Sequence, residues 1–145
     1  MSILGAKTLI ETLDLIEKGN APRIKQDDSL STYAPILSRN IACIDFSKTA
    51  DEVFNLVRGT NPWPVAHTTI LCKGVKIYTT SIVSLDNLAF KPGEVLASNE
   101  ENRLIIGCKN SAIEILTLKP EGKKIMTAKD YLQGNKIKKG TILGI

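Results

Sequence analysis

The chain has 145 residues, of which 43% are hydrophobic and 23% charged, a composition that fits one soluble globular domain and excludes disordered and fibrous chains. Its apolar runs extend over only a few residues, far short of the roughly 20 that a membrane-spanning helix needs. No secretory signal pattern is visible at its start. We therefore expect a cytoplasmic protein with no membrane partner.

The formal net charge of +4 is concentrated near the C-terminal end of the chain. Residues 119–140 hold seven lysines and two carboxylates, whereas residues 1–118 hold 12 basic and 13 acidic side chains. Clustered lysines neutralise phosphates and release their counterions, but a solvated lysine-rich surface produces the same pattern. Charge alone leaves both interpretations open.

Residues 3–18 are predicted to form an amphipathic helix that ends at Gly19. Its apolar stripe, at helical spacing, consists of Leu9, Leu13 and Ile16. The polar stretch 20–31 that comes next contains a proline and is typical of a linker. Because a single helix cannot bury its own stripe, this helix needs a surface to pack on.

A second helix is predicted from about residue 48 to residue 58, with Thr49 and Glu52 at the spacing of a capping box. The adjoining Asn61-Pro62-Trp63-Pro64 predicts a rigid turn, because two prolines fix the backbone. We expect Trp63, the only tryptophan of the chain, to pin the second helix against the next segment of the chain.

Short strands are predicted from residue 69 onward, separated by turns rich in Gly, Asn and Pro. They cover residues 69–72, 75–79, 81–84, 94–97, 103–108 and 112–118, with Lys73-Gly74 as the first hairpin turn. A short helix capped by Thr127 comes after them, and residues 137–143 are suited to a last strand. The predicted fold is mainly β with a few helices: a small antiparallel barrel or sandwich after an N-terminal helix and linker.

The sequence offers no convincing active site. His67 is the only histidine, and Cys43, Cys72 and Cys108 are too widely spaced for a zinc site, so we expect buried structural thiols. Phosphate-binding glycine motifs and nucleophile elbows do not occur. The sequence therefore predicts no catalytic, metal or cofactor-binding residue.

The clustered lysines fall into two groups that a polyanion could reach. Lys123 and Lys124 come after Pro120 at a predicted loop tip, and three more lysines surround Ile137 in the last predicted strand, namely Lys136, Lys138 and Lys139. A small β-barrel with a basic edge is suited to nucleic acid. Since only Tyr131 lies in the cluster, contacts to a folded backbone are favoured over stacking of unpaired bases.

Several stretches of the chain resemble the methionyl-tRNA formyltransferase family, in the correct order. They are Leu4-Gly5-Ala6, the run from Glu11 to Ile16, Thr32-Tyr33-Ala34-Pro35, Ile44-Asp45-Phe46, the run from Val57 to Pro64, and the run from Gly122 to Leu132. Two departures are Ile36, where members usually carry Lys, and Val65, where they usually carry Gly.

This resemblance implies the C-terminal part of a larger enzyme. Residues 1–19 resemble the last helix of a Rossmann-like formyltransferase domain, residues 20–42 a linker, and residues 43–145 an OB-like barrel. The domain that binds the co-substrate 10-formyltetrahydrofolate and carries the catalytic residues has no counterpart in this sequence. The resemblance thus implies a chain that is inactive alone and needs the missing domain as a partner.

The partner implied for the barrel is initiator tRNA, held by a basic surface in translation initiation. By that resemblance the expected contacts are Arg58, Lys123, Lys124, Lys136, Lys138 and Lys139. The two prolines and the tryptophan of the Asn61–Pro64 turn are expected to be structural.

Two other interpretations remain open at this stage. The chain is alternatively the barrel of a folate-dependent sugar formyltransferase, in which the lysines are a plain surface. It is alternatively a stand-alone module that forms a homo-oligomer through the apolar face of its first helix.

Overall fold

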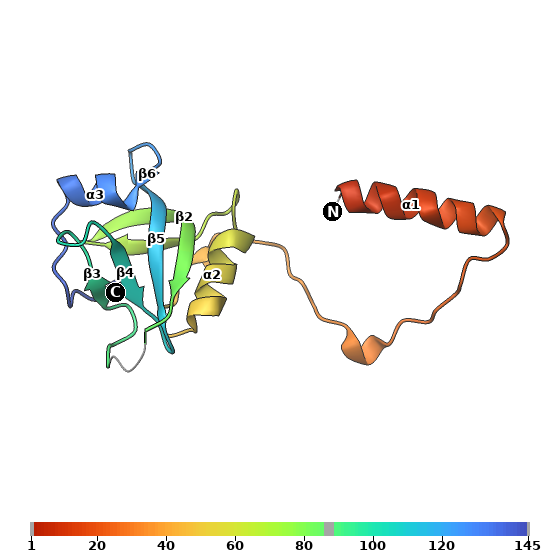
Figure 1. Ribbon diagram of the computed structural model, residues 1–145, viewed down its shortest axis with the longest axis horizontal. Helices are drawn as coiled ribbons and strands as arrows, with labels where there is room; N and C mark the ends of the chain where they lie inside the picture. Colours follow the sequence, from red (N-terminus) through yellow and green to blue (C-terminus); the bar gives the residue numbers. More distant parts are fainter. Residues whose placement is uncertain (1, 86–88, 145) are drawn as a thin grey trace. The chain divides into compact units, whose positions relative to one another are not determined.

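The computed structural model describes residues 2–85 and 89–144 and divides into two compact units, one ending at Pro35 and one beginning at Ile36. The first unit contains helix α1 (Ser2–Glu17) and a short 3-10 turn, η1 (Asp28–Leu30). The second contains the remaining helices and all the strands (Figure 1). Each unit is therefore described by itself.

Helix α1 confirms the first predicted helix. Gly19 adopts a positive φ of 68°, and two backbone bonds close the helix end: Gly19 N–H to the Ile16 carbonyl at 3.0 Å and Asn20 N–H to the Leu15 carbonyl at 2.9 Å. No described residue of α1 is buried, and Leu13 in the middle of the stripe is 55% exposed. Within the first unit, the apolar stripe of α1 is therefore not covered.

The second unit is built on one antiparallel sheet, which confirms the predicted mainly β, barrel-like class. Its strands are β1 (His67–Ile70), β2 (Lys73–Val83), β3 (Val95–Ala97), β4 (Leu104–Gly107), β5 (Ala112–Pro120) and β6 (Met126–Thr127). They lie in the order β1-β2-β5-β4-β3, and β6 pairs with β5. Strands β2 and β5 curve through the middle of the sheet (Figure 1).

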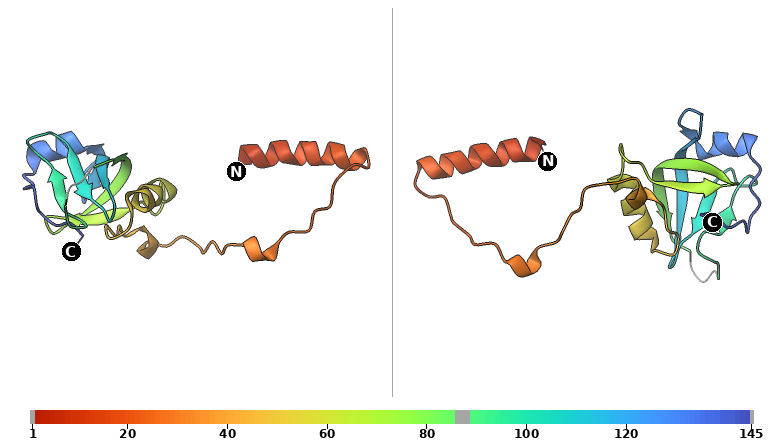
Figure 2. Two further views of the ribbon diagram at one scale, coloured as in Figure 1. Left: turned by 60° about the horizontal axis from the view of Figure 1, so that its bottom comes forward. Right: turned by 180° about the vertical axis from the view of Figure 1, so that it is seen from behind.

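Two α-helices flank this sheet, each begun by a side-chain cap. In α2 (Ala50–Gly59), Thr49 Oγ1 accepts the Glu52 N–H and Glu52 accepts the Thr49 N–H, so the predicted capping box is present. In α3 (Ala128–Gly134), Thr127 is the cap, as predicted. Helix α2 packs against β2 and β5 and α3 against β5 and β6. The two helices lie apart from each other on this curved sheet (Figure 1, Figure 2), and side chains of both pack into the same core.

The core lies between the sheet and these helices, lined by alternate residues of each strand. Its largest fully buried side chains are Val53 and Val57 of α2, Ile70, Val75, Ile77, Val95, Leu104, Ile106, Ile113, Ile115, Leu118 and Leu132. All of them belong to the second unit. None of the helices in the described residues is long and apolar enough to cross a membrane.

The first hairpin turn lies two residues earlier than predicted. Strand β1 begins at His67, and the turn consists of Leu71 and Cys72, which have φ values of 50° and 60°. Positive φ at both central residues is the geometry of a type I′ turn, which normally takes Asn-Gly. The sequence does not signal this turn, because neither residue is one that favours positive φ.

Trp63 does not pin α2, contrary to expectation, because its side chain is 57% exposed. The turn is held instead by its neighbours. The Val65 N–H donates to the Thr60 carbonyl at 2.8 Å, and Asn61 Nδ2 donates to the Tyr78 carbonyl at 3.3 Å. Val65 itself is buried with a φ of 69°, which explains why glycine is suited to this position.

Residues 137–143 do not form a complete strand, although they run along the edge of β3. A single bridge joins Glu94 to Ile142, and the Val95 N–H donates to the Thr141 carbonyl at 2.8 Å. Gly140, at a φ of 85°, bends the backbone within this segment. The pairing between this segment and β3 is therefore limited to a few residues.

The three cysteines differ in their surroundings. Cys108 is 1% exposed, and burial raises the pKa of its thiol to about 11. Cys43 and Cys72 are exposed, so the expectation of buried thiols holds for one of the three. Cys72 is exposed because it occupies the turn between β1 and β2.

Candidate nucleic-acid interface

The loop between β5 and β6 presents two of the predicted contacts. Pro120 ends β5, Gly122 turns the chain at a φ of 70°, and the Lys123 N–H donates to the Pro120 carbonyl at 3.1 Å. Lys123 and Lys124 are exposed at this tip, which projects from the sheet (Figure 1). Within residues 2–85 and 89–144, neither lysine is ion-paired. Both charges are therefore available to an anion.

The segment after α3 presents three more of the predicted contacts. Ile137 is 3% exposed and anchors the segment, while its neighbours Lys136, Lys138 and Lys139 line a surface hollow of ≈510 Å³. Lys136, Lys138 and Lys139 are all exposed. The opposite wall of the hollow is formed by residues 98–102, between β3 and β4.

Asn99 holds the two walls of this hollow together. Its Nδ2 donates to the carbonyls of Leu132 at 2.5 Å and Asn135 at 3.1 Å, and its Oδ1 accepts the Ile137 N–H at 2.8 Å. Both polar atoms of the side chain thus form hydrogen bonds. It fixes the backbone that carries the three lysines.

The hollow also contains acidic side chains. Glu100 and Glu101 line it opposite the lysines, and Glu101 Oε2 accepts the Ser98 N–H at 3.2 Å. Neither carboxylate is ion-paired within the part of the chain that the structure describes. The hollow therefore has a mixed charge.

Arg58 lies apart from the other predicted contacts. It occupies the last turn of α2, where a cation interacts favourably with the helix dipole, and its Nε donates to Asn55 Oδ1 at 2.8 Å. Helix α2 lies apart from α3 in both views of Figure 2. The structure thus distributes the six predicted contacts over three places.

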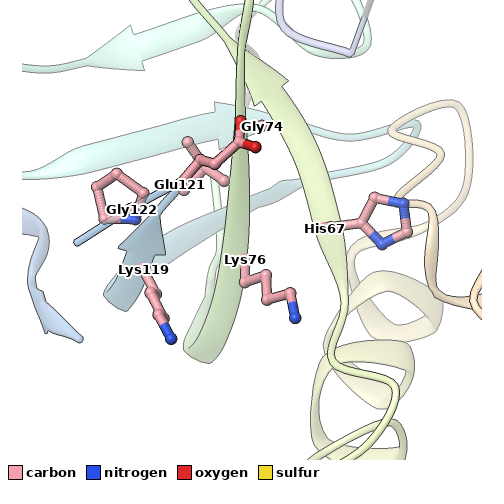
Figure 3. A pocket seen from close by; sticks show the side chains of 8 residues that line it. His67, Gly74, Lys76, Lys119, Glu121 and Gly122 are labelled. Carbon is pink, nitrogen blue, oxygen red and sulfur yellow. The ribbon is translucent and has the colours of Figure 1, made fainter. Parts of the chain in front are cut away.

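Three basic residues that the sequence did not single out as contacts lie near the β5–β6 loop. Lys76 and Lys119 are cross-strand partners and line a hollow of ≈410 Å³ with His67 (Figure 3). Lys73 shares a second hollow, of ≈300 Å³, with Lys123. The strand register brings Lys76 and Lys119 together, and no local pattern in the sequence indicates this pairing of strands.

The chemistry available on these surfaces is that of hydrogen-bond donors and positive charges. Among the residues described, no group of three His, Cys, Asp or Glu side chains could hold a metal ion. Lysine ammonium groups bind phosphate oxygens as point charges. The arrangement is therefore suited to binding a polyanion.

Comparison with known proteins identifies the family to which this chain belongs. Residues 36–136 match the family described as "Formyl transferase, C-terminal domain". The methionyl-tRNA formyltransferase of Acetivibrio thermocellus is 38% identical over 144 residues, which cover 99% of this chain and 46% of that protein. The methionyl-tRNA formyltransferase of Bacillus subtilis is 35% identical over 145 residues, covering 100% and 45%. The chain thus spans less than half the length of these relatives.

Among solved structures, HypX from Aquifex aeolicus in complex with tetrahydrofolic acid resembles this chain with a TM-score of 0.58 at 18% identity. The match covers 93% of this chain and 26% of HypX. At this identity the likeness supports the fold.

Proposed function

Because the chain belongs to the formyl transferase family through its C-terminal domain, we propose that it is the tRNA-binding C-terminal portion of a methionyl-tRNA formyltransferase. The observation that carries the proposal is the exposed tip of the β5–β6 loop, where Lys123 and Lys124 have no carboxylate partner among the described residues. Relatives of 35–42% identity that bear this enzyme's name support the choice of tRNA.

In the complete enzyme the formyl group would pass from 10-formyltetrahydrofolate to the amino group of methionyl-initiator tRNA, at translation initiation in the cytoplasm. This chain would contribute binding and positioning, which lower the entropic cost of aligning the two reactants. Catalysis and folate binding would belong to the domain that precedes it in such enzymes. The chain alone is therefore expected to bind tRNA weakly and to catalyse nothing.

The lysines suit a folded RNA backbone better than unpaired bases. Tyr131, the only aromatic side chain in the lysine-rich stretch, is 3% exposed and packs in the core, so it is not free to stack on a base. Stacking platforms are what single-strand binders use, whereas structured RNA is held through its backbone and shape. The proposed ligand surface is accordingly the sugar-phosphate backbone of the tRNA.

The test is binding of initiator tRNA to the chain across a salt series, with Lys123→Ala/Lys124→Ala as the variant. Removing two phosphate contacts should weaken binding and lower the slope of log K against log salt by about 2. The matched control is Lys48→Ala/Lys109→Ala, a neighbouring exposed pair joined by a backbone hydrogen bond of 2.9 Å.

Two outcomes would count against this proposal. An unchanged slope in the Lys123/Lys124 variant would remove the loop from the binding surface. A wild-type chain that binds no tRNA at low salt would favour the barrel of a sugar formyltransferase instead.

A further inference from the structure

A row of basic side chains crosses three neighbouring strands on one face of the sheet. In the strand register His67 of β1 lies opposite Lys76 of β2, and Lys76 lies opposite Lys119 of β5. Residues directly opposite each other project from the same face, and adjacent strands are about 4.8 Å apart. The row is therefore about 10 Å long, wider than a single phosphate group.

The Lys76–Lys119 pair is not explained by the stability of the sheet. Like charges directly opposite each other destabilise a strand pair, and Figure 3 shows both lysine side chains extending in the same direction. Elsewhere on this sheet a charge is matched: Arg103 Nη2 lies 2.6 Å from the Glu114 carboxylate. Within the described ranges, neither lysine of the row has such a partner.

The nearest candidate for a partner is Glu121, which lines the same hollow. Figure 3 shows its carboxylate beside Gly74, away from the ammonium ends of Lys76 and Lys119. The hollow of ≈410 Å³ in front of the row thus keeps an excess of positive charge.

The row is continuous with the β5–β6 loop. The hollow at the row and the hollow that holds Lys73 and Lys123 share Pro120 and Glu121 as lining residues. Basic side chains therefore extend from β1 across β2 and β5 to the loop tip. Arg58 and the mixed-charge hollow after α3 are not part of this strip.

We propose that the row of His67, Lys76 and Lys119 is a phosphate-binding site that holds the backbone of the RNA ligand beside the β5–β6 loop. This inference rests on the proposed function, since it assigns a second contact surface to the same ligand. Bound phosphates offset the repulsion between the two ammonium groups, so charges that destabilise the free sheet stabilise the complex. Lys76 and Lys119 act as point charges, and His67 adds a ring N–H donor at the end of the row.

The experiment uses the full chain and a Lys76→Gln/Lys119→Gln variant, titrated with initiator tRNA across a salt series. At about 0.9 unit per phosphate lost, the salt slope should fall by about 2 and the affinity should fall with it. Lys48→Gln/Lys109→Gln is the matched control, because it also replaces two lysines but at a different place. Lys109 lies before the start of β5, whereas Lys119 lies near its end. The melting temperature of the Lys76/Lys119 variant should not fall, since a like-charge pair is removed.

The outcomes separate this inference from the proposed function. If the wild type binds tRNA and the Lys123/Lys124 variant is weakened while the Lys76/Lys119 variant is not, the row is not a binding site and the proposed function stands. If the wild type binds no tRNA, titration with inorganic pyrophosphate monitored by NMR decides whether the row binds anions. Saturable shifts at the His67 and Lys76 signals of the wild type, with no shift of the His67 signal in the Lys76/Lys119 variant, would support the row as an anion site; the absence of shifts in the wild type would overturn it.

Discussion

At the scale of single residues, Asn99 links the barrel to the segment that carries three of the candidate lysines. Its amide donates to two carbonyls near the end of α3 and accepts the Ile137 N–H. The side chain is half-buried, so water would replace these hydrogen bonds only poorly. An amide is required here, because the site needs donors on one atom and an acceptor on the other.

We predict that Asn99→Asp destabilises the second unit. The substitution keeps the shape of the side chain but places a carboxylate oxygen against the Leu132 and Asn135 carbonyls. Losing two donors and facing two acceptors at a half-buried site should lower the free energy of unfolding by about 2 kcal/mol or more. Urea denaturation monitored by circular dichroism measures it.

The control for this substitution is Asn102→Asp, three residues further along the same turn. Asn102 is exposed and has a φ of 54°, a conformation that Asn and Asp both tolerate. The same chemical change should cost little there. Equal destabilisation by the two substitutions would contradict the role of Asn99 in joining the two segments.

The role of Asn99 is invisible in the sequence, whereas the caps of α2 and α3 are not. A capping box joins residues three positions apart, so the residue types of Thr49 and Glu52 are enough to predict it from the sequence. The partners of Asn99 lie 33 to 38 residues further along the chain. No periodicity or motif encodes a contact at that separation.

At the scale of elements, the β1–β2 hairpin is closed by an unusual turn. Leu71 and Cys72 both have positive φ, which costs an L-residue about 1–2 kcal/mol relative to its preferred backbone. Both side chains are exposed, so little packing compensates for this strain. The register that results from this turn sets His67 opposite Lys76.

We predict that Leu71→Asn combined with Cys72→Gly stabilises the hairpin. Asn-Gly is the preferred pair for a type I′ turn, so the free energy of unfolding should rise by about 1 kcal/mol. Chemical denaturation of the variant and the wild type provides the measurement. The strand register, monitored by NMR cross-strand contacts between His67 and Lys76, should stay the same.

A control separates relief of backbone strain from loss of apolar surface. Leu71→Ala removes the exposed leucine side chain but leaves an L-residue with a side chain at positive φ, so it should not stabilise. If Leu71→Ala raised stability as much as the Asn-Gly pair, the gain would come from the lost side chain rather than from the turn geometry.

At the scale of the whole molecule, charge counting locates only part of the candidate surface. The excess of lysine in residues 119–140 draws attention to the β5–β6 loop and to the segment after α3. It does not show that Lys76, from the middle of the chain, lies opposite Lys119. Charge counting also does not show on which surface a side chain lies, so it cannot separate Arg58 on α2 from the lysines near α3.

The hydrophobic core is confined to the second unit. All the buried core residues of the described chain lie at or after Ala42, and α1 contains none. An isolated helix of 16 residues is marginally stable in water. We therefore predict that residues 36–145 expressed alone unfold with the same cooperativity and midpoint as the complete chain.

Thermal unfolding monitored by near-ultraviolet circular dichroism tests this prediction, because Trp63 and two tyrosines, Tyr78 and Tyr131, lie in the second unit. The midpoints of the two proteins should agree within about 2 °C, which corresponds to well under 1 kcal/mol for a domain of this size. The far-ultraviolet helical signal of the complete chain should fall before that midpoint, as α1 melts without cooperativity. A midpoint several degrees lower for residues 36–145 would contradict this prediction, because the first unit would then contribute to the stability of the barrel.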